Sequence, residues 1–334
     1  MLRVAIVIVS FNTADLLDQC LESIARCESR CELDVIVVDN GSRDGSADRV
    51  ADRYPGVHLI RNAENLGFSK ATNQGIRITD ADYVLLLNSD TVVLPGAIDR
   101  VVEYLEAHPA AGIAGCKVLK PDGTLDAPCR RSFPTPQNAF YQRVGLSRLF
   151  PESRRFGAYY VSYLDANETA SVDCLMGAYM LIRRAVIDQI GLLDEDCFFY
   201  AEDIDYCYRA KQAGWDVVYY PGATIIHHRG ASTAKDRIKA TTYFHRSMLV
   251  YYRKHLAPRR SRLVNGLVYS GIALSYAAAL VWNKITRPRH ARPLSNLREF
   301  VGRQQPIGQR AGGVGTRVTP PDAKPDDADH TLVG

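Results

Sequence analysis

The stretch Tyr83–Asp90 (YVLLLNSD) changes abruptly from apolar to polar residues. Its apolar part is typical of a strand buried on both faces, and the polar part follows at the carboxyl end of that strand. In open α/β sheets, ligands bind at the carboxyl ends of the strands. There, the Asp90 carboxylate could hold a divalent cation and, through it, a diphosphate. Because an ordinary Asn/Ser/Asp turn gives the same local pattern, the rest of the chain has to decide between these interpretations.

The segments before this stretch alternate between strands and helices. Strands are predicted at 4–9, 33–38 and 57–61, and helices at 15–26, 46–54 and 69–79. This alternation predicts an α/β fold whose mostly parallel sheet is flanked by helices. Right-handed crossovers place the carboxyl ends of all these strands at one edge. Ser10, Asp39 and Asp90 can therefore share one cleft although they are far apart in the sequence.

The segments after Asp90 are less regular. The pattern predicts a helix at 95–108, strands at 112–119 and 176–182, helices at 184–190 and 203–213, and strand-like pieces at 217–220 and 224–227. Between them, residues 128–167 contain several prolines and arginines and a cluster of tyrosines. That composition is more typical of a long functional loop than of a core element.

The composition limits the possible functions. The 334 residues suffice for one large α/β domain with additional segments, and 46% hydrophobic residues predict a sizeable core. The formal net charge of +4 gives no global argument for nucleic acid as a partner. Arginine and lysine nevertheless dominate Arg237–Arg310, which favours either a surface for anionic lipid or a solvated basic tail.

The eight cysteines form no CxxC pair and no pattern typical of a metal site or a disulfide framework. Several lie in apolar-periodic segments, as buried free thiols do. We therefore expect a reducing, cytosolic compartment. The first apolar run, Val4–Val9, is too short for a signal peptide.

The carboxyl-terminal part follows a catalytic domain predicted for residues 1–250. Residues 251–300 are predicted to form a basic amphipathic helical region, and residues 301–334 a disordered tail. Leu263–Trp282 has no charged residue and just the length to span a bilayer. Its small and polar residues make it only weakly hydrophobic, and basic residues flank both ends. We expect it to lie in the membrane interface or to pack on the catalytic domain.

Two further polar stretches lie in the nucleotide-binding half of that domain, about residues 1–115. Asp39 and Asn40 follow the second strand, where a carboxylate can accept hydrogen bonds from a nucleotide. Gly67, in the loop before the next helix, would let the backbone approach a phosphate or base, and Asn73 follows on that helix. Capping turns and an ordinary helix start are the alternative interpretations.

The acceptor half, about residues 116–250, has its own acidic centre. Glu202, Asp203 and Asp205 follow an aromatic run at the start of a predicted helix. Acidic residues are common at helix N-termini, but three so close together repel one another, which favours a site. An ionised carboxylate there could take a proton from an attacking hydroxyl. His227 ends an apolar strand, where an imidazole can complete a metal site or can be merely structural.

The chain carries, in this order, the motifs VIVSFN, VDNGS, NLGFSKATNQG, LLLNSD, MGAYMLIRR, FFYAEDIDYCYR and IIHHRGAS. Together they resemble those of the glycosyltransferase family 2 enzymes of bacterial surface polysaccharide synthesis, notably the rhamnosyltransferase-like members. The resemblance covers about Arg3 to Ser247. It implies a GT-A-type fold, a Mg²⁺ or Mn²⁺ ion and an inverting sugar transfer. The carboxyl-terminal half has no QxxRW-like motif, so processive polymer synthesis is not expected.

The resemblance also implies a role for each candidate residue. Asn88-Ser89-Asp90 takes the place of a DxD motif, so Asp90 would bind the metal, and His227 would be a remote third ligand. Asp203 would be the general base, while Glu202 and Asp205 would orient acceptor hydroxyls or Asp203. The donor nucleotide would contact Ser10, Asn12, Asp39, Asn40, Gly67, Asn73, Asn88 and Ser89. Many relatives carry Asp in place of Asn88, so the missing anion would weaken the affinity for the metal.

The expected partners follow from the same resemblance. The donor would be dTDP-rhamnose first and a UDP-sugar second, and the acceptor a lipid-linked or growing glycan in cell-surface polysaccharide synthesis. We expect a cytoplasmic enzyme at the inner face of the cell membrane, in peripheral contact with anionic lipid and without nucleic acid.

Two alternatives remain open. A sugar nucleotidyltransferase would need a glycine-rich basic loop near the first strand, and Ser10–Thr13 offers none. A catalytically silent nucleotide-sugar-binding protein would need no base, and the intact Glu202–Asp205 cluster argues against it.

Overall fold

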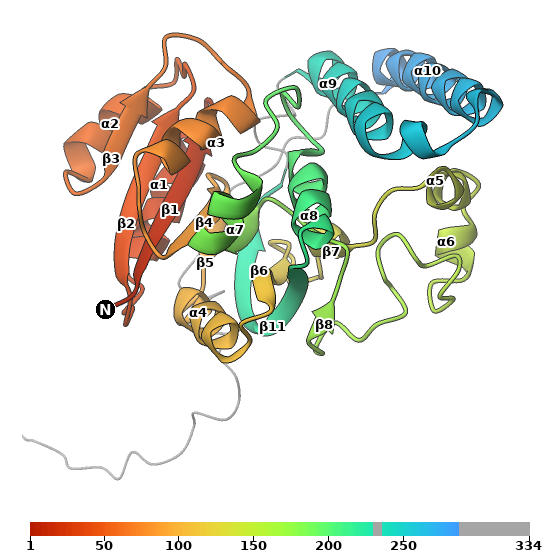
Figure 1. The fold of residues 1–334 in the computed structure, drawn as a ribbon. Coiled ribbons are helices and arrows are strands. Elements are labelled where there is room, and N and C mark those ends of the chain that lie inside the picture. Colours follow the sequence, from red (N-terminus) through yellow and green to blue (C-terminus); the bar gives the residue numbers. More distant parts are fainter. Residues whose placement is uncertain (230–235, 287–334) are drawn as a thin grey trace, which may run out of the picture. The chain divides into compact units, whose positions relative to one another are not determined.

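The computed structural model describes residues 1–229 and 236–286 of the chain (Figure 1). The strands in these residues are β1 (Arg3–Ser10), β2 (Glu32–Asp39), β3 (His58–Arg61), β4 (Tyr83–Asn88), β5 (Thr91–Val93), β6 (Ala111–Leu119), β7 (Arg130–Arg131), β8 (Ala170–Ser171), β9 (Cys174–Leu175), β10 (Tyr179–Arg183) and β11 (Asp216–His227). The helices are α1 (Ala14–Ala25), α2 (Ser46–Arg53), α3 (Phe68–Arg77), α4 (Ala97–Ala107), α5 (Pro136–Arg143), α6 (Leu146–Leu149), α7 (Arg184–Ile190), α8 (Glu202–Gln212), α9 (Arg237–Tyr251) and α10 (Arg262–Ile285).

The amino-terminal half of the main sheet is parallel, and helices lie on both of its faces (Figure 1). Its strands follow the order β3, β2, β1 and β4. β1 pairs with β2 so that Ser10 lies opposite Asp39, and with β4 so that Val9 lies opposite Asn88. The carboxyl ends of these strands therefore meet at one edge, as predicted, because each crossover helix returns the chain to the same starting edge.

The other half of the main sheet is mixed. β10 lies between β4 and β6 and is antiparallel to both, whereas β11 is parallel to β6 and antiparallel to β5. The two pieces predicted at 217–220 and 224–227 form a single strand, β11, with an irregularity between Tyr220 and Thr224. Because β11 continues to His227, that histidine pairs with Thr91, the residue after Asp90.

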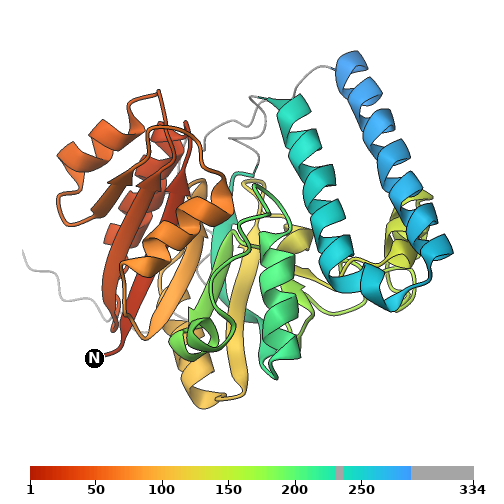
Figure 2. The same cartoon turned by 45° about the horizontal axis from the view of Figure 1, so that its top comes forward.

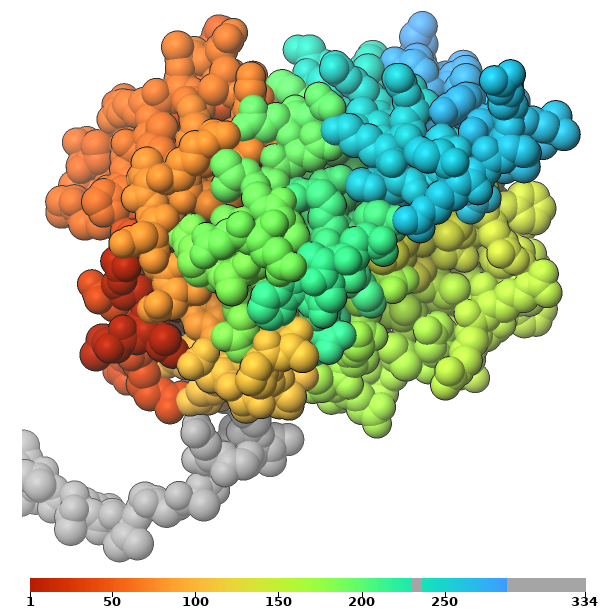
Figure 3. All heavy atoms as spheres, in the orientation of Figure 1, coloured from red at the N-terminus to blue at the C-terminus, as the bar shows by residue number. Residues whose placement is uncertain are grey.

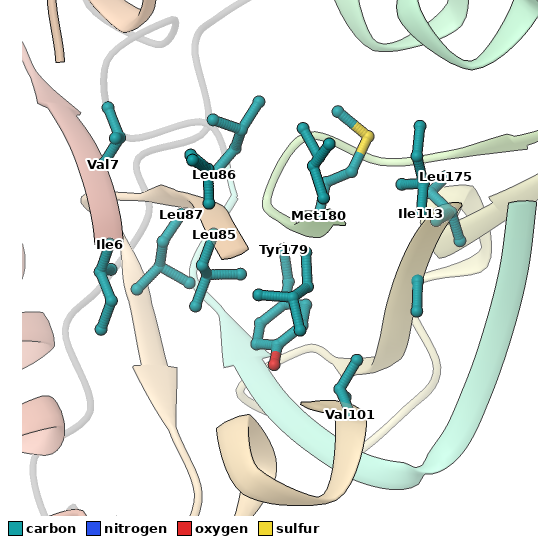
Figure 4. Close-up of a cluster of buried hydrophobic side chains, with 14 of the residues drawn as sticks. Ile6, Val7, Leu85, Leu86, Leu87, Val101, Ile113, Leu175, Tyr179 and Met180 are labelled. Atoms are coloured by element: carbon teal, nitrogen blue, oxygen red, sulfur yellow. The ribbon is translucent and has the colours of Figure 1, made fainter. Parts of the chain in front are cut away.

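The centre of the sheet is apolar (Figure 4). Leu85, Leu86 and Leu87 of β4 are buried between β1 and β10. Tyr179 is buried as well, and its hydroxyl donates a hydrogen bond of 3.0 Å to the Ala97 carbonyl, which offsets the cost of removing that group from water. A close-packed core of this kind holds the strand ends, and the polar residues that follow them, in fixed positions.

The segment 128–167 is more ordered than its composition suggests. It contains β7, α5 and α6, so the prediction of an irregular loop is wrong in part. Thr135 caps α5 by accepting a hydrogen bond from the Asn138 amide, and Pro136 occupies the first helical position, where its missing N–H costs nothing. The ring of Phe156 packs against aromatic rings from α5 and from the end of α6. Local capping and aromatic contacts therefore order this segment.

Helices α9 and α10 form an antiparallel hairpin (Figure 2). The helix predicted over Leu263–Trp282 is present as α10, and none of its residues is buried. Of the described helices it is the one long and apolar enough, by length and composition alone, to cross a membrane. The tail predicted for 301–334 and the end of the 251–300 region lie outside the described residues.

Candidate active site

Hydroxyl groups connect the ends of β1 and β4. Ser10 Oγ lies 3.1 Å from Thr13 Oγ1, which in turn lies 2.9 Å from Ser89 Oγ. All three side chains are buried. This chain of hydroxyls fixes the turn after β4 to the turn after β1, so the structure brings together Ser10 and Ser89, two of the residues predicted to contact the donor.

Asp39 and Asn12 hold the neighbouring turns of the same edge. Asp39 Oδ1 accepts a hydrogen bond of 3.0 Å from the Ser42 amide and so stabilises the turn after β2. Asn12 has a φ of +55°, a left-handed conformation that asparagine tolerates better than most residues. Its Oδ1 accepts a hydrogen bond of 2.8 Å from the Arg43 amide. These contacts tie the turn after β1 to the turn after β2.

A second group of predicted residues meets where β4 and β11 end. Asp90 Oδ1 lies 3.2 Å from His227 Nε2, and Asn88 Nδ2 lies 3.4 Å from the same nitrogen. On the other side of the ring, His227 Nδ1 lies 3.3 Å from Asp126 Oδ2. Asp90, Asp126 and His227 are all buried. The pairing of β11 with β5 thus brings Asp90 and His227 into direct contact.

The charges in this group stabilise one another. Burial alone would lower the pKa of His227, but the charge of Asp90 and the hydrogen bond to Asp126 raise it to about 9. Burial would likewise raise the pKa of Asp90, yet the charge of His227, its hydrogen bond and a main-chain hydrogen bond together offset burial and lower the pKa below its ordinary value. Arg229 Nη1 lies 2.9 Å from Asp126 Oδ1. Two acids therefore surround one protonated imidazole, which has to lose its proton before it can bind a cation.

The chemistry of this group fits a divalent cation. The 3.2 Å between Asp90 Oδ1 and His227 Nε2 is close to the roughly 3.0 Å between adjacent ligands of an octahedral cation bound at about 2.1 Å. Asp126 lies where a carboxylate commonly orients a metal-binding histidine. Residues 1–229 and 236–286 contain no group of three or more His, Cys, Asp or Glu side chains that could hold a metal ion. Asp90 and His227 therefore offer two ligands, and a diphosphate and water would have to complete the set.

The acidic centre lies at the start of α8. Asp203 Oδ2 lies 2.5 Å from Arg131 Nη2 and accepts a hydrogen bond of 3.2 Å from the Gly177 amide. Asp203 Oδ1 accepts a hydrogen bond of 2.7 Å from the Ile204 amide. Arg131 also donates to the Leu175 carbonyl, at 2.7 Å, so its own position is fixed. One guanidinium and two amides therefore hold the Asp203 carboxylate in a single orientation.

Glu202 lies next to Asp203 in a different environment. Its side chain is buried, and its Oε2 has no hydrogen-bond partner among the residues that the structure describes. Burial, together with the charge of Asp203, raises the pKa of Glu202 to about 8. At neutral pH most of the Glu202 side chains therefore carry a proton, while Asp203 is paired with Arg131.

Two consecutive residues connect the two centres. The Ala178 carbonyl accepts a hydrogen bond of 3.2 Å from the amide of Asn88, which lies two residues before Asp90. The Gly177 amide donates its hydrogen bond to Asp203. The Asp90–His227 pair and the acidic centre are therefore attached to the same short stretch of main chain, although they are far apart in the sequence.

Asp205 does not face Asp203. One of its oxygens lies 2.6 Å from His255 Nε2, and the other lies 2.8 Å from Arg209 Nε. Both oxygens are therefore engaged on the side of α8 that faces the segment after α9. The expectation that Asp205 orients Asp203 is not supported by this geometry.

Three residues predicted to contact the donor are engaged in internal packing. Asn40 donates a hydrogen bond of 3.2 Å to the Gly67 carbonyl. Gly67 has a φ of +89°, and a Cβ there would lie 2.8 Å from the Phe198 carbonyl oxygen, so its packing against Phe198 requires glycine. Asn73 bonds the main chain of Leu193 through both ends of its amide. These contacts account for the three residue types without a donor, and contact with a donor stays a prediction.

Two residues of the site, Asp126 and Arg131, have no clear signal in the sequence. Asp126 precedes a short 3-10 helix, Ala127–Cys129, and Arg131 belongs to the two-residue strand β7. Both lie in or beside the segment predicted as a loop, where the run of arginines was the available signal. Their importance is visible only in the fold, because it shows both charged groups withdrawn from water beside a partner.

Comparison with known proteins gives consistent matches in sequence. Residues 3–248 match the model of a family described as glycosyltransferase like family 2. The chain is 32% identical over 267 residues to the N-acetylglucosaminyl-diphospho-decaprenol L-rhamnosyltransferase of Mycobacterium tuberculosis, which covers 77% of this chain and 84% of that protein. It is 26% identical to the rhamnosyltransferase WbbL of Escherichia coli (strain K12), covering 67% of this chain and 83% of that protein.

The fold is also found among solved structures. The mannosyltransferase PcManGT from Pyrobaculum calidifontis, in complex with GDP-Man and Mn²⁺, matches with a TM-score of 0.54 and 19% identity, over 86% of this chain and 76% of that chain. At this identity the likeness concerns the fold alone, and it confirms the GT-A-type sheet flanked by helices that the motifs imply. Because the family match extends over most of its length and rhamnosyltransferases are among its relatives, the chain belongs to glycosyltransferase family 2 and is rhamnosyltransferase-like.

Proposed function

We propose that this glycosyltransferase transfers a sugar, with inversion, from a nucleoside diphosphate sugar to a hydroxyl of a lipid-linked or growing glycan. The observation that carries the proposal is the attachment of the Asp90–His227 pair and of Asp203 to the same main-chain stretch, Gly177–Ala178. One centre is suited to bind a diphosphate through a cation, and the other to accept a proton. dTDP-rhamnose is the first donor to test and UDP-sugars the second, because two relatives are named as rhamnosyltransferases.

The proposed reaction is a single displacement. The acceptor oxygen attacks the anomeric carbon while the bond from that carbon to the diphosphate breaks, and the nucleoside diphosphate leaves with the bonding electron pair. Asp203 accepts the proton of the attacking hydroxyl. Because attack and departure occur on opposite faces of the sugar, the configuration inverts. Positioning contributes most of the acceleration, and the base contributes about 10²–10⁴-fold.

Arg131 and Glu202 support Asp203 in this step. The guanidinium of Arg131 holds one oxygen of the carboxylate, and so directs it. Glu202, which is protonated at neutral pH, adds no second negative charge that would repel the ionised base. Its buried Oε2 is available for a hydrogen bond to an acceptor hydroxyl.

Asp90 and His227 would hold Mg²⁺ or Mn²⁺, with Asp126 orienting the imidazole. When bound, such a cation offsets the charge that develops on the departing nucleoside diphosphate. The Mn²⁺ in the related mannosyltransferase structure supports this choice of metal. Asn88 contributes an amide beside the pair, so we expect a lower metal affinity than a second carboxylate would give.

A panel of nucleotide sugars tests the proposed function. The full chain is mixed with dTDP-rhamnose, UDP-sugars or GDP-mannose, with and without Mg²⁺ or Mn²⁺, and donor binding and slow donor hydrolysis are measured. We expect one donor to bind in a metal-dependent way and to be hydrolysed with inversion. Binding without hydrolysis or transfer would favour a silent binding protein. Release of diphosphate from a nucleoside triphosphate and a sugar phosphate would favour a nucleotidyltransferase.

The surface around α10 supports a second part of the proposal, that the protein works at the inner face of the cell membrane. Arg143 of α5 donates a hydrogen bond of 3.2 Å to Ser275 of α10, and Figure 3 shows the α5–α6 segment beside the hairpin. Exposed large apolar side chains on these helices and their ends are Phe140, Val144, Leu149, Phe150, Leu263, Leu267, Leu274, Val281, Trp282 and Ile285. Exposed apolar side chains together with arginines are typical of surfaces that bind anionic membranes.

Removal of residues 263–334 should therefore release the protein from vesicles that contain an anionic lipid. A sedimentation assay with phosphatidylcholine and phosphatidylglycerol vesicles measures the bound fraction. Removal of residues 301–334 alone is the control, and it should leave most of the binding intact if α10 makes the contact. Equal binding of the full chain and of the chain without residues 263–334 would contradict this proposal.

A further inference from the structure

Helix α9 has two sides with different neighbours. Ser247 donates a hydrogen bond of 2.9 Å to the Phe199 carbonyl. His255, in the π-helical segment Tyr252–Leu256 that continues α9, lies 2.6 Å from Asp205. These contacts attach one side of α9 to α8 and to the loop in front of it. The other side turns toward α10.

Between α9 and α10 lies a groove of about 670 Å³. Its apolar wall includes Leu249 of α9 and Tyr269, Ile272 and Ala273 of α10. The volume lies within the range of about 300–1,000 Å³ that is typical of ligand sites. A mainly apolar groove of this size is better suited to a hydrocarbon chain than to a sugar or a nucleotide, which would lose hydrogen bonds to water there.

Two arginines, Arg246 and Arg253, also line the groove, about two helical turns apart. In the described parts of the chain neither guanidinium forms an ion pair with a carboxylate, whereas the adjacent Lys254 is paired with Asp194 and Asp196. Arginines without a carboxylate partner are suited to bind phosphate oxygens in pairs. The groove therefore matches a ligand with a hydrocarbon chain and a phosphate or diphosphate head.

The side of α9 that faces away from the groove contacts the loop that leads into the acidic centre. Tyr243 of α9 stacks on Phe198, with ring centroids 4.4 Å apart. The next residue, Phe244, contacts Tyr200, with centroids 5.6 Å apart. Tyr200 lies just before Glu202, so α9, which forms one wall of the groove, packs with its other side on the segment that carries the proposed base. The groove and that segment are therefore on opposite sides of the same helix.

We propose that the groove between α9 and α10 binds the isoprenoid chain of a polyprenyl-diphosphate-linked acceptor, with the diphosphate on Arg246 and Arg253. The inference rests on the proposed function, because it assigns the place of the lipid part of that acceptor. The hydrocarbon lies between the two helices, the diphosphate lies on the two arginines, and the attached sugar projects out of the groove. Contacts with the distant lipid then help to hold the hydroxyl in position.

The first test uses farnesyl diphosphate, a short and soluble polyprenyl diphosphate, and measures its binding to the full chain by calorimetry. Saturating dTDP and Mg²⁺ are present so that the donor site does not take up the diphosphate. Ala273→Trp fills the groove, and Ala278→Trp places the same side chain at an exposed position of α10 outside it. We expect Ala273→Trp to weaken binding at least about tenfold and Ala278→Trp to leave it unchanged. Equal affinities in both variants overturn the inference.

The charged part of the groove is tested with the same probe. Arg246→Gln combined with Arg253→Gln should weaken farnesyl diphosphate binding at least about tenfold. Arg259→Gln combined with Arg260→Gln removes the same charge from exposed positions that do not line the groove and should have no effect. Farnesol and inorganic diphosphate, which each carry one half of the probe, should bind more weakly than farnesyl diphosphate. An equal loss in both double variants would show attraction by overall charge and would contradict the inference.

Two further measurements separate this inference from the membrane-binding proposal and from the proposed function. Ala273→Trp should keep its binding to phosphatidylcholine and phosphatidylglycerol vesicles, and a parallel loss would assign the groove to membrane phospholipid instead. With a polyprenyl-diphosphate-linked acceptor, Ala273→Trp should raise KM and leave kcat unchanged. Unchanged transfer kinetics would overturn the groove assignment while the proposed function stands. Specific binding of farnesyl diphosphate by a chain that uses no nucleotide sugar would instead overturn the proposed function.

Discussion

The two polar centres of this glycosyltransferase are built from opposite charge patterns. At the ends of β4 and β11, one histidine lies between two acids, Asp90 and Asp126. At the start of α8, Asp203 is paired with Arg131, and the pKa of its neighbour Glu202 is raised to about 8. The first pattern places two carboxylates beside an imidazole that can bind a metal once it has lost its proton. The second keeps one carboxylate directed and its neighbour protonated, and such a difference between adjacent acids is typical of sites that move a proton.

Asp203→Asn should break the proton-accepting centre and have the largest effect. Asparagine keeps the shape of the side chain but cannot accept the proton, so we expect kcat to fall by about 10²–10⁴-fold or more. Donor affinity should be retained, because the cation-binding pair is intact. Steady-state kinetics and donor titration measure the two effects. Asp196→Asn, at an exposed acid just before α8, is the control. Near-normal turnover of Asp203→Asn would show that another group is the base.

Asp90→Ala should impair the other centre, and the loss should appear in donor affinity. It removes one of the two ligands offered to a cation, so donor affinity in the presence of Mg²⁺ or Mn²⁺ should fall by about 10–100-fold. The affinity measured after chelation of the metal should change much less. Calorimetry with and without a chelator separates these contributions. An unchanged donor affinity would contradict the assignment of Asp90.

Asp126→Asn tests the Asp90–His227 pair indirectly. Asp126 contacts the nitrogen of His227 on the far side of the ring from Asp90, so it can affect a bound cation only by orienting the imidazole. Loss of an outer carboxylate typically costs up to about 10–100-fold in metal affinity, so we expect the lower part of that range. Metal titration of the donor complex measures this loss. The kcat at saturating metal should be nearly normal, and a kcat loss as large as that of Asp203→Asn would place Asp126 in a different role.

Glu202→Gln should have the smallest effect on activity, and its effect on the free energy of unfolding should depend on pH. The unfolded carboxyl titrates at about its ordinary pKa of 4.5, and the folded one at about 8. The stability that protonated Glu202 contributes is therefore full below the unfolded pKa and is lost as the pH rises through the folded pKa. Glutamine resembles the neutral acid at every pH, so the stability of the variant relative to the natural chain should rise over this range, by up to about 5 kcal/mol at the alkaline end. Urea unfolding at several pH values measures the difference, and parallel curves would contradict the raised pKa.

The fold could be predicted in large part from the sequence. Continuous apolar strands alternate with helices in the first ninety residues, and the right-handed crossover rule then places Ser10, Asp39 and Asp90 at one edge. The antiparallel insertion of β10 could not be predicted, because strand patterns carry no direction. The sequence predicts two separate strand-like pieces where the structure has the single strand β11, because the irregularity after Tyr220 interrupts the apolar pattern.

The site was predictable where a residue stands at the end of a regular element. Asp90, His227 and Asp203 do so, and the structure gives each of them a charged partner. Asp126 and Arg131 do not, since they come from short irregular elements whose position depends on long-range contacts. The role of Asn73 cannot be decided from the sequence, because an amide next to a motif has the same appearance whether it contacts a ligand or a buried backbone; its contact with the donor stays a prediction.

The position of Gly177 and Ala178 just before β10 has a consequence for how such enzymes can vary. Tyr179, the next residue, pairs with Leu87 in the middle of the sheet, so a hydrogen-bond ladder determines where this stretch lies. An insertion of one residue here would turn every following side chain of β10 to the opposite face. The distance between the Asp90–His227 pair and the proposed base is thus determined by the core of the sheet, and we expect different acceptors to be accommodated by changes in the peripheral helices and loops.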